Sequence, residues 1–161
     1  PAAIDPAQER VLHFMVEEQG RYGRKNGKGF YDYPAGGKKT LWPGLSALAT
    51  TRLDPETLDI AELKQRLLVI QSVEAARTIA EGVVTDPREA DVGSVLGFGF
   101  APFTGGAISY IDGMGAAAFV ALCDRLTEKY GARFAPPQLL REMAAKGESF
   151  YGRHSAHQHA A

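Results

Sequence analysis

The sequence is poor in the features that would place a protein outside the cell, in a membrane or on nucleic acid. It has one cysteine, Cys123, which excludes an intramolecular disulfide. No apolar run reaches the ~20 residues that a membrane-spanning helix needs, and the amino end lacks the charged, then apolar pattern of a secretory signal. A net charge of -1 over 161 residues gives no general attraction for nucleic acid or anionic lipid. We therefore expect a cytoplasmic protein that neither spans a membrane nor binds nucleic acid.

Strand signals are scarce as well, whereas signals that start and stop helices recur. Apolar residues fall at helical spacing and rarely alternate with polar ones. A capping box at 59–62 and a proline after Asp5 are typical helix starts, and Gly20 is a typical stop. The sequence predicts an all-α helical bundle with an irregular aromatic segment at 21–53. The expected helices cover 5–20, 59–82, 115–130 and 136–147, with a further helix that begins at 85–89.

Residues 91–112, DVGSVLGFGFAPFTGGAISYID, form an almost uncharged run with two glycine clusters. Gly97-Phe98-Gly99 resembles the start of a dinucleotide-binding fingerprint, but that fingerprint follows a strand and a helix is expected here. The chain also lacks Gly-Lys-Ser and Gly-Lys-Thr, which argues against a phosphate-binding loop of that kind. We interpret the run as a structural joint, in which glycines permit turns and close helix approach while aromatic side chains fill the space. Its predicted members are Gly97, Phe98, Gly99, Phe100, Pro102, Phe103, Gly105 and Gly106.

A basic, glycine-rich stretch at 21–33 is the second unusual feature. Residues 21–29 hold four cations and three glycines. Backbone amides and ammonium groups in such a loop can bind a phosphate, which makes Arg24, Lys25 and Lys28 candidate contacts. The same composition is also typical of an exposed loop that leads into an extended aromatic segment, and this is the interpretation that we favour.

The four histidines do not form a recognisable site. His13 falls within the first expected helix, where we expect a partly buried helix residue rather than a base. His154, His157 and His159 lie in a polar tail, with no acidic or cysteine ligand beside them. We therefore predict no metal site.

Candidate nucleophiles also lack partners in the sequence. Ser94 and Ser109 occur in apolar helical contexts without a nearby His-Asp pair, and Cys123 falls in the middle of a helix, where cysteine usually fills a core. Glu74 is expected to stay solvated or to pair with Arg77 on the same helix. The sequence thus predicts no catalytic residue.

Two motifs carry a resemblance to a known family: GRYGRKNGKGFYDYP at 20–34 and EGVVTDPREADVGSVLGFGFAPFTGGAISYID at 81–112. In order and approximate spacing they closely resemble the carboxy-terminal region of 3-hydroxyacyl-CoA dehydrogenases, above all the multifunctional β-oxidation enzymes that also contain enoyl-CoA hydratase. The resemblance extends from Ile4 to about Tyr151. The sequence departs from the family at 101–104, where the family commonly has two prolines before the phenylalanine and often an arginine after it.

The resemblance implies a fold and a division of the chain. The expected fold is the 6-phosphogluconate-dehydrogenase-like carboxy-terminal domain, which the family builds from two related helical repeats. Residues 1–53 would be the last helix of the first repeat with its basic, aromatic connection, 54–152 the second repeat, and 153–161 a flexible tail.

The resemblance also implies that the catalytic parts of the family lie outside the matched region. The family's NAD-binding Rossmann domain and its catalytic histidine-glutamate pair lie upstream of the matched region, so we expect no cofactor-binding residue here and NAD in the whole protein. The implied reactions are oxidation of L-3-hydroxyacyl-CoA and hydration of enoyl-CoA. A CoA phosphate becomes the candidate ligand of Arg24, Lys25 and Lys28.

The implied partners are the Rossmann domain, the first helical repeat and a thiolase subunit. We also expect self-association, because a missing repeat would uncover either the face carrying Leu63, Leu67 and Ile70 or the aromatic run 98–103. Two alternatives are a free-standing module that binds an acyl or CoA-like ligand at 98–103 and a pure protein-interaction domain. The start at Pro1, in the middle of a repeat, argues against both.

Overall fold

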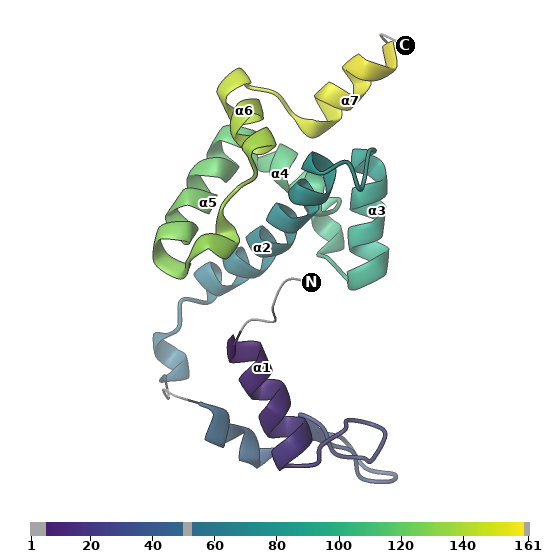
Figure 1. Cartoon of the computed structure of the whole chain (residues 1–161), viewed down its shortest axis with the longest axis vertical. Coiled ribbons are helices and arrows are strands. Elements are labelled where there is room, and N and C mark those ends of the chain that lie inside the picture. The colour runs from purple at the N-terminus through teal and green to yellow at the C-terminus, as the bar shows by residue number, and fades with distance from the viewer. Residues whose placement is uncertain (1–5, 50–52, 160–161) are drawn as a thin grey trace. The chain divides into compact units, whose positions relative to one another are not determined.

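Helices make up most of the chain, which confirms the predicted all-α class (Figure 1). The computed structural model describes residues 6–49 and 53–159. Its internal contacts divide the chain into two compact parts, Pro1–Leu58 and Asp59–Ala161, which we call the N-terminal unit and the C-terminal unit. The assignment of the chain to two sequence repeats stays a prediction.

The N-terminal unit begins with α1, Pro6–His13, which continues into a π-helical turn, η1, Phe14–Glu18. The segment predicted to be irregular contains a small antiparallel sheet, in which β1, Tyr31–Asp32, pairs with β2, Thr40–Leu41. Two 3-10 helices follow, η2, Pro43–Leu48, and η3, Pro55–Thr57. Strands of two residues are too short to leave an alternating pattern in the sequence.

The C-terminal unit follows the predicted start and stop signals. The Asp59 carboxylate accepts a hydrogen bond from Glu62 N (2.9 Å) and caps the longest helix, which is one half of the predicted capping box; the Glu62 carboxylate pairs with Lys129 (2.7 Å). Asp86 caps the next helix in the same way through Arg88 N (2.9 Å). The elements are α2 (Ile60–Ala80), α3 (Pro87–Phe98), η4 (Pro102–Thr104), α4 (Ala107–Met114), α5 (Ala116–Tyr130), η5 (Ala132–Phe134), α6 (Gln138–Lys146) and α7 (Phe150–His159).

Two of these helices have no counterpart in the sequence prediction. Helix α4 ends at Gly115, whose φ of +86° turns the chain so that α4 and α5 meet at 105°. Among the described residues no single helix is both long and apolar enough to cross a membrane, although this bent pair reaches that length and composition together. Helix α7 occupies the segment for which a flexible tail is predicted; its flexibility stays a prediction.

The apolar core of the C-terminal unit is centred on α2, as expected, and its buried face overlaps the predicted stripe in part. Of the predicted Leu63, Leu67, Ile70 and Val73, Val73 is fully buried and Ile70 packs against the core, whereas Leu67 is exposed. The other buried residues of α2 are Val69, Ser72 and Ala76. Helices α5 and α6 pack against each other and also contribute to this core (Figure 1). The large core side chains include Val69, Val73, Ile108, Ile111, Phe119, Leu122, Leu126, Phe134, Leu140, Met143 and Phe150.

Candidate functional site

A buried carboxylate, Asp91 on α3, organises the predicted joint. Its oxygens accept hydrogen bonds from Ile108 N (2.7 Å), Ser109 N (3.1 Å) and the Ser109 hydroxyl (2.5 Å). These donors belong to the first turn of α4, where the residue at the cap position, Gly106, has no side chain to satisfy them. Asp91 therefore caps α4 from a neighbouring helix and places a negative charge at the positive end of the helix dipole.

The backbone of the joint requires glycine at two positions. Gly105 and Gly106 have φ values of +85° and +129°, which side chains rarely adopt. A Cβ on Gly106 would overlap the Asp91 carboxylate, and one on Gly105 would lie 3.0 Å from the Ser109 Cβ. Ser94 completes the contact, because its hydroxyl accepts a hydrogen bond from Ala107 N (3.1 Å). The loop thus brings the start of α4 directly onto α3.

Helix α7 closes this polar network. The Asp112 carboxylate, on α4, accepts hydrogen bonds from Phe150 N (2.9 Å) and Tyr151 N (3.0 Å) and so caps α7. The Tyr151 hydroxyl in turn donates to Asp91 (2.8 Å). Burial, followed by this hydrogen bond to Asp91, raises the pKa of Tyr151. Each of α3, α4 and α7 therefore depends on a side chain from another of the three.

Only one of the expected aromatic residues fills the joint. Phe100 is 1% exposed and packs edge-on against Tyr110, with ring centroids 6.3 Å apart. Phe98 and Phe103 are 59% and 86% exposed, so their predicted place inside the joint is corrected. Gly99, with a φ of +75°, ends α3 and turns the chain so that Phe100 points inward while its neighbours do not.

Two further predicted members also lie outside the close contact. Gly97 is within α3 and has open space where a Cβ would be, and Pro102 is exposed at the start of η4. The joint that the structure shows is therefore smaller than predicted: Gly99, Phe100, Gly105 and Gly106, with Asp91 and Ser94 as polar members that the sequence did not reveal. The available signal was the pair of aspartates, Asp91 and Asp112, at the two ends of an otherwise uncharged run.

The candidate nucleophiles all have structural partners. Ser94 donates to the Asp91 carbonyl (2.8 Å), and Ser109 donates to the Asp91 carboxylate. Among the described residues neither hydroxyl has a histidine partner that could take its proton. Cys123 is fully buried, and this burial raises the pKa of its thiol to about 12. A thiol with that pKa is not a nucleophile near neutral pH.

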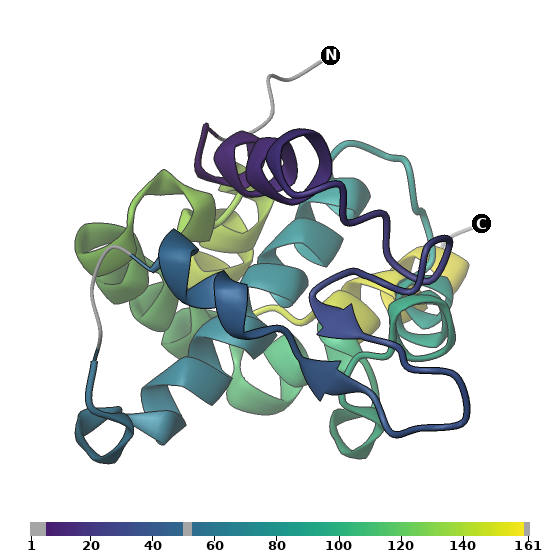
Figure 2. The same ribbon diagram turned by 90° about the horizontal axis from the view of Figure 1, so that it is seen from below.

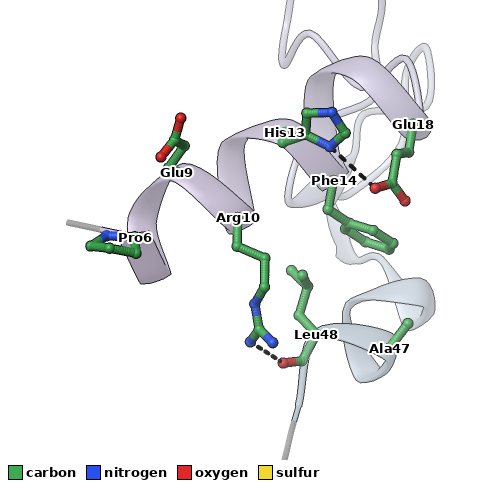
Figure 3. Close-up of a pocket in the computed structure, with 8 residues that line it drawn as sticks. All are labelled: Pro6, Glu9, Arg10, His13, Phe14, Glu18, Ala47 and Leu48. Carbon is green, nitrogen blue, oxygen red and sulfur yellow. Dashed lines mark hydrogen bonds and ion pairs between the residues drawn. The ribbon is translucent and has the colours of Figure 1, made fainter. Parts of the chain in front are cut away.

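An open cavity of about 510 Å³ lies in the N-terminal unit, between α1 and η2. Figure 3 shows the residues that line it. His13 Nδ1 lies 3.2 Å from a Glu18 oxygen, and Arg10 donates to the Leu48 carbonyl (3.3 Å). The His13 and Glu18 side chains are 63% and 52% exposed, so His13 is not the partly buried residue that we expected. An exposed pair of this kind has neither the burial nor a third group to hold it as a base.

His154 belongs to a second surface cluster, at the start of α3. Its Nε2 lies 3.6 Å from an Asp86 oxygen and 3.2 Å from Arg88. The hydrogen bonds from Arg88 lower the pKa of Asp86 to about 2. The side chains of His157 and His159 lie outside the described residues, and within those residues no three histidine, cysteine or acidic groups are placed to hold a metal ion.

The basic stretch divides into one buried cation and several exposed ones. Arg21 is 8% exposed; it donates to the Gly29 carbonyl (2.7 Å), pairs with Asp32 and stacks on Trp42, 4.1 Å from the ring centroid. It therefore forms the centre of the N-terminal unit. The predicted phosphate contacts Arg24, Lys25 and Lys28 all lie on the surface.

An apolar groove of about 390 Å³ lies between α2 and α3 in the C-terminal unit. Ile70 and Ala75 line it from α2, and Ala90 and Phe98 line it from α3. Two acidic residues, Glu74 and Glu89, also line it. Ile70 and Phe98 belong to the two faces that were predicted to lose their cover.

The comparisons with known proteins point to one kind of relative. No family model matches the chain. The chain is 44% identical to a fatty acid oxidation complex subunit alpha from Shewanella amazonensis over 152 residues, and 40% identical to the protein of that name from Shewanella putrefaciens over 132 residues. These matches cover 94% and 81% of this chain but only 20% and 19% of the relatives, in their carboxy-terminal region. The chain thus spans about a fifth of the length of the curated relatives that it matches.

Proposed function

Since this chain is homologous to the carboxy-terminal fifth of fatty acid oxidation complex alpha subunits, we propose that it is the helical carboxy-terminal part of an NAD-dependent 3-hydroxyacyl-CoA dehydrogenase. The whole protein would oxidise L-3-hydroxyacyl-CoA to 3-ketoacyl-CoA in fatty-acid β-oxidation and would also hydrate enoyl-CoA. The 44% identity over nearly all of this chain is the observation that carries the proposal. A match of that level over a fifth of a longer protein is typical of one shared domain.

The role of this part is support rather than chemistry. In the described residues, the one buried carboxylate, Asp91, uses its oxygens to hold α4 and α7, and the one cysteine is buried with a raised pKa. Such groups stiffen a domain but do not move protons on a substrate. The network fixes α3 and α4 against each other, which suits a part that braces a catalytic cleft built elsewhere.

The uncovered apolar groove between α2 and α3 supports a role in assembly. A patch lined by Ile70 and Phe98, with exposed Leu67 and Leu96 on the same two helices, is typical of a surface that another protein part covers. Its proposed cover is the rest of the dehydrogenase, with a thiolase subunit as a further partner of the whole protein.

A chimera tests this proposal. The carboxy-terminal region of the 44% identical relative is replaced by this chain, and oxidation of NADH by acetoacetyl-CoA is followed by absorbance. We expect the chimera to keep most of the activity of the unmodified relative, and a version truncated before the region to lose it. This chain by itself should give no turnover, because it would lack the dinucleotide-binding domain.

Two results would contradict the proposal. One is a truncated relative that remains fully active, since the region would then support nothing. The other is turnover by this chain alone above the rate without protein. A chimera that carries Gly106→Ala should be inactive because its joint is disrupted, whereas the matched control, Gly113→Ala, should keep the activity of the chimera.

The same surface makes a prediction for the isolated chain. Uncovered apolar area forgoes roughly 25 cal/mol for each Å², so we expect self-association, most simply as a twofold dimer through the groove. Light scattering after size exclusion, over micromolar to hundreds of micromolar protein, measures it. Phe98→Glu should shift the mass toward the monomer, whereas Leu41→Glu, an exposed apolar position in the N-terminal unit, should not. A monomer at all concentrations would mean that the groove needs no cover.

A further inference from the structure

The exposed cations of the N-terminal unit are gathered at one end of its small sheet by the path of the chain. Residues 20–49 contain six basic residues and one acidic residue, although the whole chain has a net charge of -1. The acidic residue, Asp32, is paired with the buried Arg21. The other five charges, on Arg24, Lys25, Lys28, Lys38 and Lys39, are exposed, and no ion pair balances them among the residues that the structure describes.

Antiparallel pairing explains why these charges meet. Gly23 bridges to Lys28, Lys28 bridges to Asp32, and Asp32 pairs with Thr40, so the chain reverses direction at each step. Three successive reversals place the turn 24–27 and the loop 33–39 at the same end of the sheet. Tyr33 N also donates to the Gly27 carbonyl (2.9 Å), which joins the two directly. Figure 2 shows both turns on the same side of this unit.

The hydrogen bonds that hold the turn do not use its cationic groups, although the Arg24 guanidinium lies over the Tyr33 ring, 5.6 Å from its centroid. The Asn26 side chain accepts hydrogen bonds from Tyr22 N (3.2 Å) and Lys28 N (3.3 Å) and donates to the Gly20 carbonyl (2.7 Å). The backbones of Gly23 and Lys28 exchange two further hydrogen bonds, of 2.7 and 3.0 Å. A turn closed in this way presents its basic side chains to solvent without an entropy cost for ordering the backbone.

We propose that this basic end, defined by Arg24, Lys25, Lys28, Lys38 and Lys39, binds the phosphate groups of coenzyme A. Several cations on two ordered turns suit a ligand with several phosphates on one flexible scaffold, because each phosphate can meet a different cation. An open cavity of about 490 Å³ beside them provides room and an aromatic wall; Asn26, Lys28, Tyr33 and Pro34 line it, together with Asp32, whose carboxylate is paired with Arg21. The choice of coenzyme A among organic phosphates rests on the proposed function.

The experiment titrates coenzyme A into the ¹⁵N-labelled chain and follows the backbone amides of 23–41 by NMR. We expect shifts confined to the two turns and weaker binding as salt is added. The variant Lys25→Gln, Lys28→Gln, Lys38→Gln should bind about tenfold more weakly, since an exposed charge contact contributes up to ~1 kcal/mol. The matched control is Lys64→Gln, Arg125→Gln, Lys146→Gln, which removes the same charge from exposed positions of the C-terminal unit and should bind like the parent chain.

Titrations with other phosphate compounds test whether the site prefers coenzyme A. Dephospho-coenzyme A should bind more weakly than coenzyme A, and inorganic phosphate more weakly still. Three results would each overturn the proposal. One is equal affinity for inorganic phosphate and coenzyme A, and another is binding of phosphatidylglycerol vesicles without binding of coenzyme A. The third is an equal loss of coenzyme A affinity in the control variant. An unchanged amide spectrum outside the turns verifies that each variant is folded. Because binding is measured on this chain alone, a chimera without activity would not affect the result.

Discussion

The interiors of the two units differ in chemistry: one is apolar, and the other is organised by a charged side chain. The C-terminal unit has a continuous apolar core to which α2, α4, α5, α6 and α7 all contribute. In the N-terminal unit, the buried side chains among the described residues are those of Met15 and Arg21. The guanidinium of Arg21 organises two carbonyls, one carboxylate and the Trp42 ring, and so replaces the role that apolar packing has in the other unit.

This difference shows how the length of a unit decides which interactions stabilise its interior. Residues 59–159 are enough to bury a set of large apolar side chains, whereas the N-terminal unit is too short to do so. It relies on directional hydrogen bonds, which lose their value when one partner is removed. We therefore expect the N-terminal unit to be most sensitive to loss of one polar side chain. The C-terminal unit should be most sensitive to a substitution at a point of close packing.

The largest effect should come from Gly106→Ala in the C-terminal unit. The new Cβ would overlap the Asp91 carboxylate, at a residue whose φ is +129°. Backbone strain and overpacking together should lower the free energy of unfolding by about 3 kcal/mol or more. Thermal unfolding followed by circular dichroism measures the change.

Gly113→Ala is the matched control for that variant. Gly113 lies in α4 as well, has ordinary helical backbone and has open space where a Cβ would be. Alanine there should leave stability unchanged or raise it by ~0.5–1 kcal/mol, because it favours the helix. Equal melting temperatures for the two variants would show that the contact between Gly106 and Asp91 is not tight.

A smaller effect, confined to the other unit, is expected for Arg21→Met. The change removes the hydrogen bonds to Gly29 and Asp32 and leaves buried carbonyls without a donor, at a cost of about 2 kcal/mol. Hydrogen exchange of the amides at 23–41 should become faster while the amides of α2 and α5 keep their protection. Arg24→Met, at an exposed arginine three residues away, should change neither set. Simultaneous loss of protection in both units would contradict the separation that we infer.

The smallest effect, and one of opposite sign, concerns Ser72. Its hydroxyl is buried in the core face of α2 and has no hydrogen-bond partner within the part of the chain that the structure describes, so Ser72→Ala should raise the free energy of unfolding by about 1 kcal/mol. Ser94→Ala is the same change at a buried serine that both donates and accepts, and it should lower stability by about 1 kcal/mol. Chemical denaturation of the pair tests the sign; destabilisation by both changes would mean that the Ser72 hydroxyl is satisfied.

Local signals in the sequence determined the all-α class and most helix boundaries. The caps at Asp59 and Asp86 and the stops at Gly131 and Gly147 act within a few residues, so they can be recognised without knowledge of the rest of the fold. The sequence also determined that Gly105 and Gly106 allow an unusual backbone, and its two long motifs determined the resemblance. All of these depend on residues that are neighbours along the chain.

Only the tertiary structure decided which side chains meet across the chain. Asp91 and Ser109 are 18 residues apart, and Asp91 and Tyr151 are 60 apart, so no local pattern could reveal that one carboxylate holds α4 and α7. The same is true of Arg21, which looks like its basic neighbours in sequence but is buried. Which apolar residues of α2 become buried was likewise decided by the elements that pack against it, because burial depends on the packing partner and not on the helix alone.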